Sequence, residues 1–275
     1  MTAGRLSGKV VVVTGAARGN GLAIASRLVD EGARVVMGDL LEDQVLDAAA
    51  SLDDGTGRAV GVRCDVTSEA DVEALMARAA ELGGPHAVVA QAGARHEGGI
   101  MSTTPEQWDA FMAVDVKGTF LCARAAIPHM RRLGGGSIVA MSGTYGFLPE
   151  PGVAVQAAGK GAVAALTRAI AVEAGPDNIR CNCIVPGYID TPMLRRWADD
   201  HPDPQAAIDA AADMHALRRI GRAEEIAAMA AFLVSDDSSF CSGQAYFVDG
   251  GLAAGMNTTY KAAALQGNTA RGIDN

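Results

Sequence analysis

Three glycines, Gly15, Gly19 and Gly21, follow Thr14 and a run of four valines at residues 10–13. The valine run predicts a strand buried on both faces, because a central parallel strand is covered by helices on each side. Beyond the glycines, apolar residues recur at helical spacing up to Glu31. The turn therefore leads into a helix N-terminus, whose free N–H groups and positive dipole end bind a diphosphate. An ordinary tight strand-to-helix turn is the alternative.

An acidic residue about twenty positions further on makes this prediction more specific. Residues 34–38 predict a second strand, and Asp39 stands at its end. A carboxylate there accepts both hydrogens of an adenosine ribose diol and repels a 2′-phosphate, which favours NAD over NADP. A solvated loop aspartate is the alternative.

Strand and helix patterns alternate along the rest of the chain, which predicts an α/β fold: a single doubly wound (Rossmann) domain with a mostly seven-stranded parallel sheet. Ligands of such a sheet bind where its strands end. Further strands are expected at residues 58–63, 86–90, 137–142, 179–185 and 245–248, and further helices at residues 41–52, 68–82, 105–130, 152–174 and 223–233.

The domain is expected to span residues 1–251, followed by a C-terminal tail at 252–275 that has no strong period. Residues 188–218 contain three prolines and are predicted to be an irregular, mobile lid, with His201 and His215 on its surface.

Composition narrows the class of protein. The 275 residues are 49% hydrophobic, enough for one large core, and a net charge of −9 argues against a nucleic-acid partner. No run of 18 apolar residues and no signal peptide is seen, so a cytoplasmic protein without a membrane partner is expected. The five cysteines are scattered, and the closest pair, Cys181 and Cys183, has no nearby ligand to complete a metal site. We therefore expect buried free thiols and no metal.

The motifs together resemble those of the short-chain dehydrogenase/reductase (SDR) family, in its form of about 250 residues, over residues 6–251. The resemblance rests on the segment from Thr14 to Gly21, on residues 64–66, on Ala92-Gly93, on Lys160, and on the segments 186–193 and 248–251.

This resemblance implies an NAD(H)-dependent oxidoreductase acting on a small hydroxyl or carbonyl substrate, and a homotetramer or homodimer built on the long helices. It places Asp65 and Val66 at the adenine, Lys160 on the nicotinamide ribose, and Ile189 and Thr191 at the carboxamide. The full set of expected cofactor-binding residues is Thr14, Gly15, Arg18, Gly19, Asn20, Gly21, Asp39, Asp65, Val66, Gln91, Ala92, Gly93, Lys160, Pro186, Gly187, Ile189 and Thr191.

The chain departs from its relatives at the proton-handling positions. Members of the family usually carry a Tyr four residues before the active-site Lys, a Ser thirteen before that Tyr, and an Asn on the preceding long helix. Here these positions hold Gln156, Gly143 and Asp115. A Gln amide neither gives nor takes a proton at neutral pH, and loss of a general acid typically costs about 10² to 10⁴ in rate. Asp115 could instead pair with Lys160 across the cleft.

Three residues are candidates to replace the missing acid. Tyr145 lies two positions beyond Gly143, Tyr188 lies in the segment expected near the nicotinamide, and His96 lies in the loop after Gly93. The alternatives are pocket walls for the two tyrosines and an exposed loop position for the histidine.

Three functions remain open at this point. The first is an oxidoreductase with a non-standard acid and base. The second is a redox-neutral enzyme on the same scaffold, such as a C–C lyase, hydrolase or cyclase, that uses Asp115, Lys160 or His96. The third is a catalytically silent NAD-binding protein. The residues placed for a dinucleotide favour the first.

Overall fold

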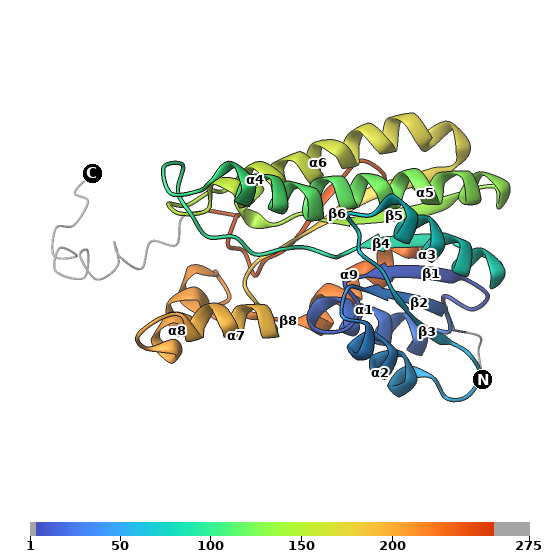
Figure 1. The fold of residues 1–275 in the computed structure, drawn as a ribbon, viewed down its shortest axis with the longest axis horizontal. Helices are drawn as coiled ribbons and strands as arrows, with labels where there is room; N and C mark the ends of the chain where they lie inside the picture. Colours follow the sequence, from blue (N-terminus) through green and yellow to red (C-terminus); the bar gives the residue numbers. More distant parts are fainter. Residues whose placement is uncertain (1–3, 256–275) are drawn as a thin grey trace, which may run out of the picture.

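The computed structural model describes residues 4–255 of the chain. Seven parallel strands form one sheet in the order β3-β2-β1-β4-β5-β6-β9 (Figure 1), which confirms the doubly wound fold. The strands are β1 (Val10–Thr14), β2 (Arg34–Asp39), β3 (Ala59–Arg63), β4 (Ala87–Ala90), β5 (Gly136–Met141), β6 (Ile179–Pro186) and β9 (Ala245–Val248). The order reverses at β1, so the carboxyl ends of β1 and β4 border the crevice in which such sheets bind ligands.

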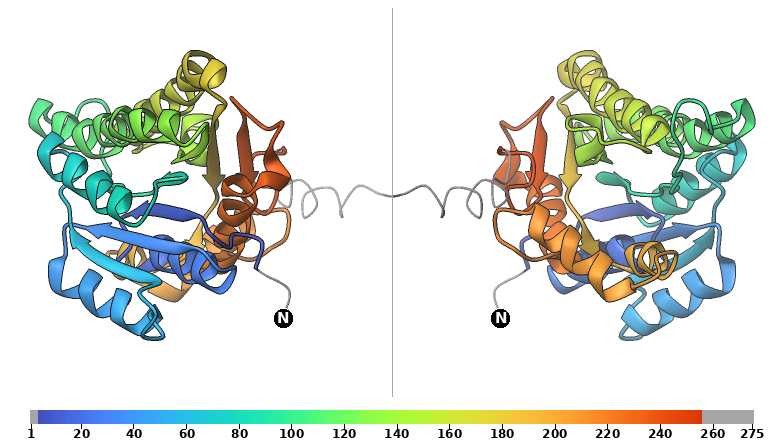
Figure 2. Two further views of the ribbon diagram at one scale, coloured as in Figure 1. Left: turned by 90° about the vertical axis from the view of Figure 1, so that its right-hand side faces the viewer. Right: turned by 90° about the vertical axis from the view of Figure 1, so that its left-hand side faces the viewer.

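Helices cover both faces of the sheet (Figure 2). One face packs against α1 (Gly19–Asp30), α2 (Glu42–Leu52) and α9 (Ala223–Val234). The other packs against α3 (Glu69–Glu81), α5 (Gly118–Arg132) and α6 (Ala154–Ala174). The valines of β1 explain this arrangement: Val11 and Val13 enter the first core, and Val10 and Val12 the second.

The long helix expected at 105–130 is interrupted. It consists of α4 (Pro105–Met112), a π-helical turn η1 (Ala113–Lys117) and α5. The N–H of Gly118 bonds to the carbonyl of Ala113 across the wider turn, and the hydroxyl of Thr119 donates to the carbonyl of Asp115 at 2.7 Å. The turn places the Asp115 carboxylate in the interior, where the residue is only 2% exposed.

The prediction of an irregular segment at 188–218 is wrong. The segment contains α7 (Pro192–Asp199) and α8 (Pro204–Met214), and two of its three prolines, Pro192 and Pro204, open these helices. Proline is accepted at the first helical position because that position needs no N–H. Short strands β7 (Ile189–Asp190) and β8 (Gly221–Arg222) pair at the base of the segment. The expectation that it moves as a lid stays a prediction.

His215, expected on the surface of that segment, is also corrected: it is 1% exposed. Its Nε2 accepts the N–H of Tyr188 at 3.2 Å, so it supports the chain where β6 leads into β7.

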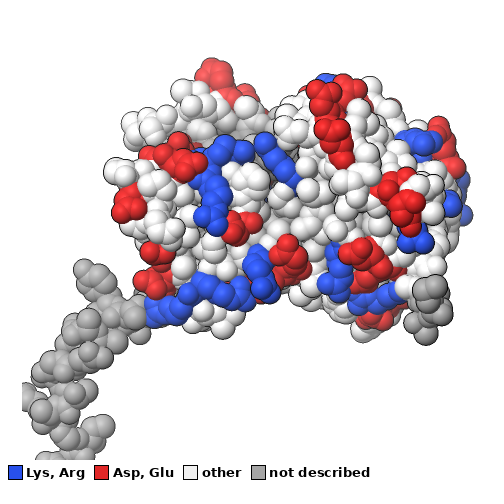
Figure 3. Space-filling model, turned by 90° about the horizontal axis from the view of Figure 1, so that it is seen from below, with Lys and Arg blue, Asp and Glu red and all other residues white. Residues whose placement is uncertain are grey.

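Charged side chains of both signs lie on the face shown in Figure 3, where several Lys and Arg side chains form a row along the lower edge with Asp and Glu beside them. Many are paired, for example Arg195 with Asp190 at 2.7 Å. No helix among residues 4–255 combines the length and apolarity needed to cross a lipid bilayer. Of the predicted tail, residues 256–275 lie outside the described part of the chain.

Candidate functional site

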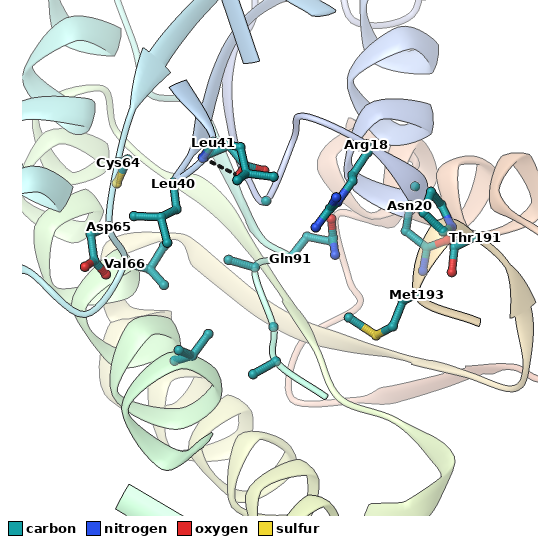
Figure 4. Close-up of a pocket in the computed structure, with 18 of the residues that line it drawn as sticks. Arg18, Asn20, Leu40, Leu41, Cys64, Asp65, Val66, Gln91, Thr191 and Met193 are labelled. Carbon is teal, nitrogen blue, oxygen red and sulfur yellow. Dashed lines mark hydrogen bonds between the residues drawn. The ribbon is translucent and has the colours of Figure 1, made fainter. Parts of the chain in front are cut away.

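A cleft of about 380 Å³ lies at the carboxyl ends of β1 to β4 (Figure 4). Its walls come from the residues that directly follow each strand and, on the opposite side, from α7 and the residue before it. The lining residues are Gly15, Arg18, Gly19, Asn20, Asp39, Leu40, Leu41, Cys64, Asp65, Val66, Gln91, Ala92, Gly93, Ala94, Val114, Thr191, Pro192, Met193 and Arg196. Most of the residues that the sequence predicted for a dinucleotide therefore meet in one place.

The N-terminus of α1 opens into this cleft. Its N-cap, Arg18, has extended backbone angles and makes no side-chain cap, and the first helical turn holds no acidic residue. Within residues 4–255, no carboxylate forms an ion pair with Arg18, and Figure 4 shows its side chain reaching over the pocket toward Gln91. Free helix N–H groups beside an unpaired guanidinium form a site for an anionic diphosphate.

Two glycines make the tight turn possible. Gly15 has a φ of +66°, and a Cβ there would lie 2.8 Å from the Cα of Ala92. A Cβ at Gly21 would lie 2.0 Å from the carbonyl oxygen of Gly15. Both distances are too short for any side chain, so the glycines are required for the close approach of β1, α1 and β4.

Asp39 is held in place by two backbone N–H groups. Its Oδ2 accepts from Ala17 at 3.0 Å and its Oδ1 from Leu41 at 3.0 Å, the bond that is dashed in Figure 4. Each oxygen retains a second lone pair, so the carboxylate can accept further hydrogen bonds from a ribose diol.

At the same end of the cleft, Asp65 and Val66 form the adjoining wall. The Oδ1 of Asp65 accepts both the N–H and the hydroxyl of Thr67, at 2.9 and 2.8 Å. The turn is thereby fixed, with Val66 presenting an apolar surface suited to the flat face of an adenine.

Two buried polar atoms of the cleft have no hydrogen-bond partner: Oδ1 of Asn20 and Oε1 of Gln91. A buried oxygen without a partner costs about 1–3 kcal/mol, so such groups usually mark a place for a ligand or water. Together with the open helix terminus and the fixed Asp39, they fit a dinucleotide. Among residues 4–255, no group of three or more His, Cys, Asp or Glu side chains could hold a metal.

The other predicted cofactor residues do not line the cleft. The hydroxyl of Thr14 accepts hydrogen bonds from the N–H groups of Gln91 and Ala92, at 3.1 and 3.2 Å, and ties the end of β1 to the turn after β4.

The predicted residues after β6 lie next to a second cavity. Pro186 ends β6, and Gly187 lies against Asp249 and His215. Ile189 lines a second cavity of about 400 Å³, together with Tyr188 and His215. Gly21 and Lys160 also lie outside the lining.

Lys160 and Asp115 form an ion pair next to the cleft. The Nζ of Lys160 lies 2.6 Å from Oδ1 of Asp115 and 3.3 Å from the carbonyl oxygen of Met141. The Oδ2 of Asp115 accepts the N–H of Ala94 at 2.8 Å. A Cβ on Gly93 would be 3.3 Å from Asp115 Oδ1 and 3.6 Å from Lys160 Nζ, so the pair borders the end of the cleft. The expected pairing across the cleft is confirmed.

Positions 143 and 156, where most members of the resembled family carry a Ser and a Tyr, lie beside Lys160. Gly143 is extended, with a φ of −179°, and a Cβ on it would be 3.4 Å from Cγ of Lys160. Gln156 is half-buried in the first turns of α6, one helical turn before Lys160. The lysine is therefore surrounded at these positions by groups that cannot transfer a proton.

Tyr145 and Tyr188 meet above this region. Their hydroxyl oxygens are 2.8 Å apart, and the Tyr145 hydroxyl donates to Oε1 of Glu150 at 2.8 Å. Burial raises the pKa of Tyr145, and Tyr188 and Glu150 add to the effect. Burial raises the pKa of Tyr188 to about 12. Both phenols are therefore protonated at neutral pH.

The third candidate acid, His96, is half-buried in the loop after β4, and its Nε2 lies 3.1 Å from the Thr103 hydroxyl. The neighbouring Arg95 bonds to Asp200 at 3.1 Å, which joins this loop to the end of α7. The structure places His96 apart from the contacts that join the two tyrosines.

Sequence reasoning missed Glu150 and Trp197. The ring centroid of Trp197 lies 5.7 Å from that of Tyr188. The signal for Glu150 was its position between two prolines in an otherwise apolar loop, where an isolated carboxylate is unusual. Arg196, which lines the cleft from α7, was missed because the segment was predicted to be irregular.

Known proteins share this fold and much of this sequence. A family described as Enoyl-(Acyl carrier protein) reductase matches residues 15–253. The meso-2,3-butanediol dehydrogenase of Serratia marcescens is 39% identical, over 91% of this chain and 96% of its own length. The cis-4-hydroxycyclohexanecarboxylate dehydrogenase of Sinomonas cyclohexanicum is 40% identical, over 90% of this chain and 97% of its own.

A solved structure agrees with these matches. A short-chain type dehydrogenase/reductase from Mycobacterium marinum superimposes with a TM-score of 0.83 at 32% identity, covering 90% of this chain and 96% of that one. The chain belongs to the short-chain dehydrogenase/reductase family.

Proposed function

We propose that the protein is an NAD(H)-dependent oxidoreductase that acts on a small hydroxyl or carbonyl substrate and handles the proton without the family's usual Ser and Tyr. The observation that carries the proposal is the continuity of the dinucleotide cleft with the Lys160–Asp115 pair at Gly93. Relatives are named as dehydrogenases of hydroxyl compounds, which supports the reaction class.

Different residues of the cleft bind different parts of the cofactor. The α1 N-terminus and Arg18 hold the diphosphate, Asp39 accepts the adenosine ribose hydroxyls, and the wall at Asp65 and Val66 faces the adenine. When bound, the nicotinamide accepts or supplies the hydride. Lys160, held by Asp115, donates to the nicotinamide ribose from its place beside Gly93.

The choice of NAD over NADP follows from Asp39. Its carboxylate is fixed by two backbone N–H groups and cannot swing away from a 2′-phosphate, which it would repel.

Proton transfer falls to the two tyrosines. Gly143 and Gln156 offer no group that ionises, whereas Tyr145, two residues after Gly143, shares a hydrogen bond of 2.8 Å with Tyr188. We assign the donor role to this pair rather than to His96.

The proposal is tested by nicotinamide absorbance with NAD or NADP and a panel of alcohols that includes meso-2,3-butanediol, L-fucose and cyclopentanol, the compounds named for relatives. We expect NAD-dependent turnover that Lys160→Ala abolishes. Lys117→Ala is the matched control, because Lys117 lies on the surface of η1 and donates to the carbonyl of Thr67, away from Lys160 and Asp115. Turnover no greater with the unchanged protein than with Lys160→Ala would refute the proposal.

The buried Asp115–Lys160 pair favours one second candidate, redox-neutral acid and base chemistry on the same scaffold. Product formed with no change in the oxidation state of the nicotinamide would support it.

We also propose that the subunits associate as a homotetramer or homodimer. Large apolar side chains are exposed along the long helices, where Phe120 is 45% and Val172 is 78% exposed. Sedimentation analysis tests this, and a monomer at micromolar concentration would refute it. The cytoplasmic location and the division into a domain at 1–251 and a tail at 252–275 stay predictions.

A further inference from the structure

The two tyrosines and Glu150 form a closed triangle of hydrogen bonds. The Tyr145 hydroxyl donates to Oε1 of Glu150 at 2.8 Å, because a carboxylate has no hydrogen to give. Tyr145 has a single hydroxyl hydrogen, so the 2.8 Å contact between the two phenol oxygens takes its hydrogen from Tyr188. The Tyr188 hydroxyl can also donate to Oε1 of Glu150, at 3.3 Å, and this third contact closes the triangle. The two shorter contacts, at 2.8 Å each, define a chain of donors from Tyr188 through Tyr145 to Glu150.

This direction leaves the Tyr188 oxygen free to accept a hydrogen. Tyr188 stands between β6 and β7, three residues before Thr191, which lines the cleft. The turn that carries Tyr145 packs on α6 at Lys160, where a Cβ on Gly146 would lie 3.1 Å from Cβ of Lys160. Tyr188 itself lines the second cavity with His215, so the pair of tyrosines joins that cavity to the turn that packs on Lys160.

We infer that Glu150 is the residue that receives the proton of the substrate hydroxyl, relayed through Tyr188 and Tyr145. The inference rests on the proposed oxidoreductase function. The bound oxidised nicotinamide would take the hydrogen of the substrate C–H bond together with the bonding electron pair, which leaves a carbonyl. The O–H proton then passes to the oxygen of Tyr188. The Tyr188 proton passes to Tyr145, and the Tyr145 proton passes to Glu150, which releases it to water. Reduction of a carbonyl follows the same path in reverse.

The relay explains how two buried phenols can act without ionising. Burial raises the pKa of both, that of Tyr188 to about 12, so a free phenolate is inaccessible at neutral pH. When each phenol gains a proton as it loses one, neither becomes charged. The charge changes only at the carboxylate, which is half-buried and therefore in reach of water.

Charged and titratable groups face the triangle from several elements. No Lys or Arg among residues 4–255 forms an ion pair with Glu150, so its negative charge is not neutralised. Glu97, from the loop after β4, adds negative charge near Tyr188 and so raises its pKa. The His215 ring lies 5.8 Å from the ring of Tyr188, and Lys160 lies below on α6, already paired with Asp115.

The decisive variant is Glu150→Gln, because the amide oxygen still accepts from Tyr145 but the side chain cannot take up a proton. We expect kcat/KM for alcohol oxidation at neutral pH to fall by about 10² to 10⁴. The remaining activity should rise with pH as the phenols ionise, whereas the unchanged enzyme should show no such dependence. Glu150→Asp should recover part of the rate, and its profile should resemble that of the unchanged enzyme.

If Glu150 had only a structural role, Glu150→Gln would not alter the pH profile of the rate. A second measurement tests the role of Glu150 without relying on turnover. Tyrosinate absorbance in the near ultraviolet should appear at lower pH in Glu150→Gln than in the unchanged protein, because the carboxylate that disfavours phenolate is gone. Glu97→Gln is the matched control: Glu97 is a second carboxylate near Tyr188, but its hydrogen bonds go to Arg95. This control should keep the neutral-pH rate.

The outcomes separate the two proposals. No nicotinamide-linked turnover in the unchanged protein overturns the proposed function, and the inference with it. Turnover that Glu150→Gln leaves unchanged in rate and pH profile overturns the inference alone. Equal losses in Glu150→Gln and Glu97→Gln also overturn it, since a general effect of charge would then account for both.

Discussion

The Nζ of Lys160 and Oδ1 of Asp115 are 2.6 Å apart, and the carboxylate also accepts the backbone N–H of Ala94 at 2.8 Å. Asp115 thus ties α6 to the loop after β4 from a position where its side chain is 1% exposed. Removal of one partner of a buried pair leaves the other charge uncompensated.

Asp115→Ala should therefore lower the free energy of unfolding by about 3 kcal/mol, as measured by urea denaturation. Asp115→Asn should cost less, because its amide oxygen still accepts from Ala94. A loss below about 0.5 kcal/mol in Asp115→Ala would contradict the structural role of the pair.

Asp39 should decide which cofactor binds. In Asp39→Ala, both the acceptor for the adenosine ribose hydroxyls and the repulsion of a 2′-phosphate are lost. We expect affinity for NAD to fall about tenfold or more, which corresponds to about 1.4 kcal/mol, while affinity for NADP stays constant or rises.

Quenching of protein fluorescence by each cofactor gives the two dissociation constants. Asp47→Asn is the control, because Asp47 lies on the exposed side of α2, away from the cleft. An unchanged ratio of the two constants in Asp39→Ala would show that this carboxylate does not select the cofactor.

Restoring the family's usual groups should raise the rate of alcohol oxidation. A Cβ at position 143 makes only ordinary contact with Lys160, at 3.4 Å, so Gly143→Ser fits. Gln156→Tyr places a phenol one turn from Lys160. The double variant should gain about 10²-fold or more in kcat, because it supplies a direct general acid and base.

The same variant separates the present mechanism from that of its relatives. Its activity should no longer depend on Glu150, so adding Glu150→Gln to it should change kcat little. A double variant that remains as sensitive to Glu150→Gln as the unchanged enzyme would contradict this expectation.

Lowering the pH should reduce the contribution of the junction between β8 and α9 to the free energy of unfolding. The hydrogen bonds from Arg219, with a further one from the N–H of Arg222, lower the pKa of Glu225 to about 2. Because this pKa is lower in the folded protein than in the unfolded chain, the stabilisation is complete above about pH 4.5 and is lost as the pH falls towards 2.

Between those pH values the stability of the unchanged protein should fall by about 1 kcal/mol more than that of Glu225→Gln, since solvent screens much of the interaction. Urea denaturation at a series of pH values measures the difference. Glu224→Gln, an exposed neighbour on α9, should follow the unchanged protein, and parallel curves for Glu225→Gln would rule out the proposed contribution.

The sequence predicted the sheet because its strands are long apolar runs with strong periodic signals, as in residues 10–13. It predicted the wall of the cleft because these residues directly follow strands, and parallel strands bring their ends to one edge. Glu150 and Tyr188 lie in loops, where no periodic pattern indicates which side chains meet. Their contact depends on the path of the chain between β5 and α6 and after β6, which only tertiary packing determines.

The error at 188–218 has a specific physical cause. Three prolines in this segment favour an irregular chain, but Pro192 and Pro204 each stand at a first helical position, after Thr191 and Asp203 as N-caps. The Asp203 side chain accepts the N–H of Ala206 at 3.0 Å, a capping bond that identifies the start of α8. Proline after a capping residue predicts a helix start, and this rule outweighs the irregular appearance of the segment.

The π-helical turn at Ala113–Lys117 has a consequence for how the family can diverge. Each residue of a helix advances the side chains by about 100°, so a deletion within this turn would rotate the whole of α4 relative to α5. A codon lost between Asp115 and α5 would turn the carboxylate away from its ammonium partner, whereas one lost before Asp115 would leave its register with α5 unchanged. The same loss of one residue can therefore abolish the pair or spare it, depending on the side of Asp115 on which it falls.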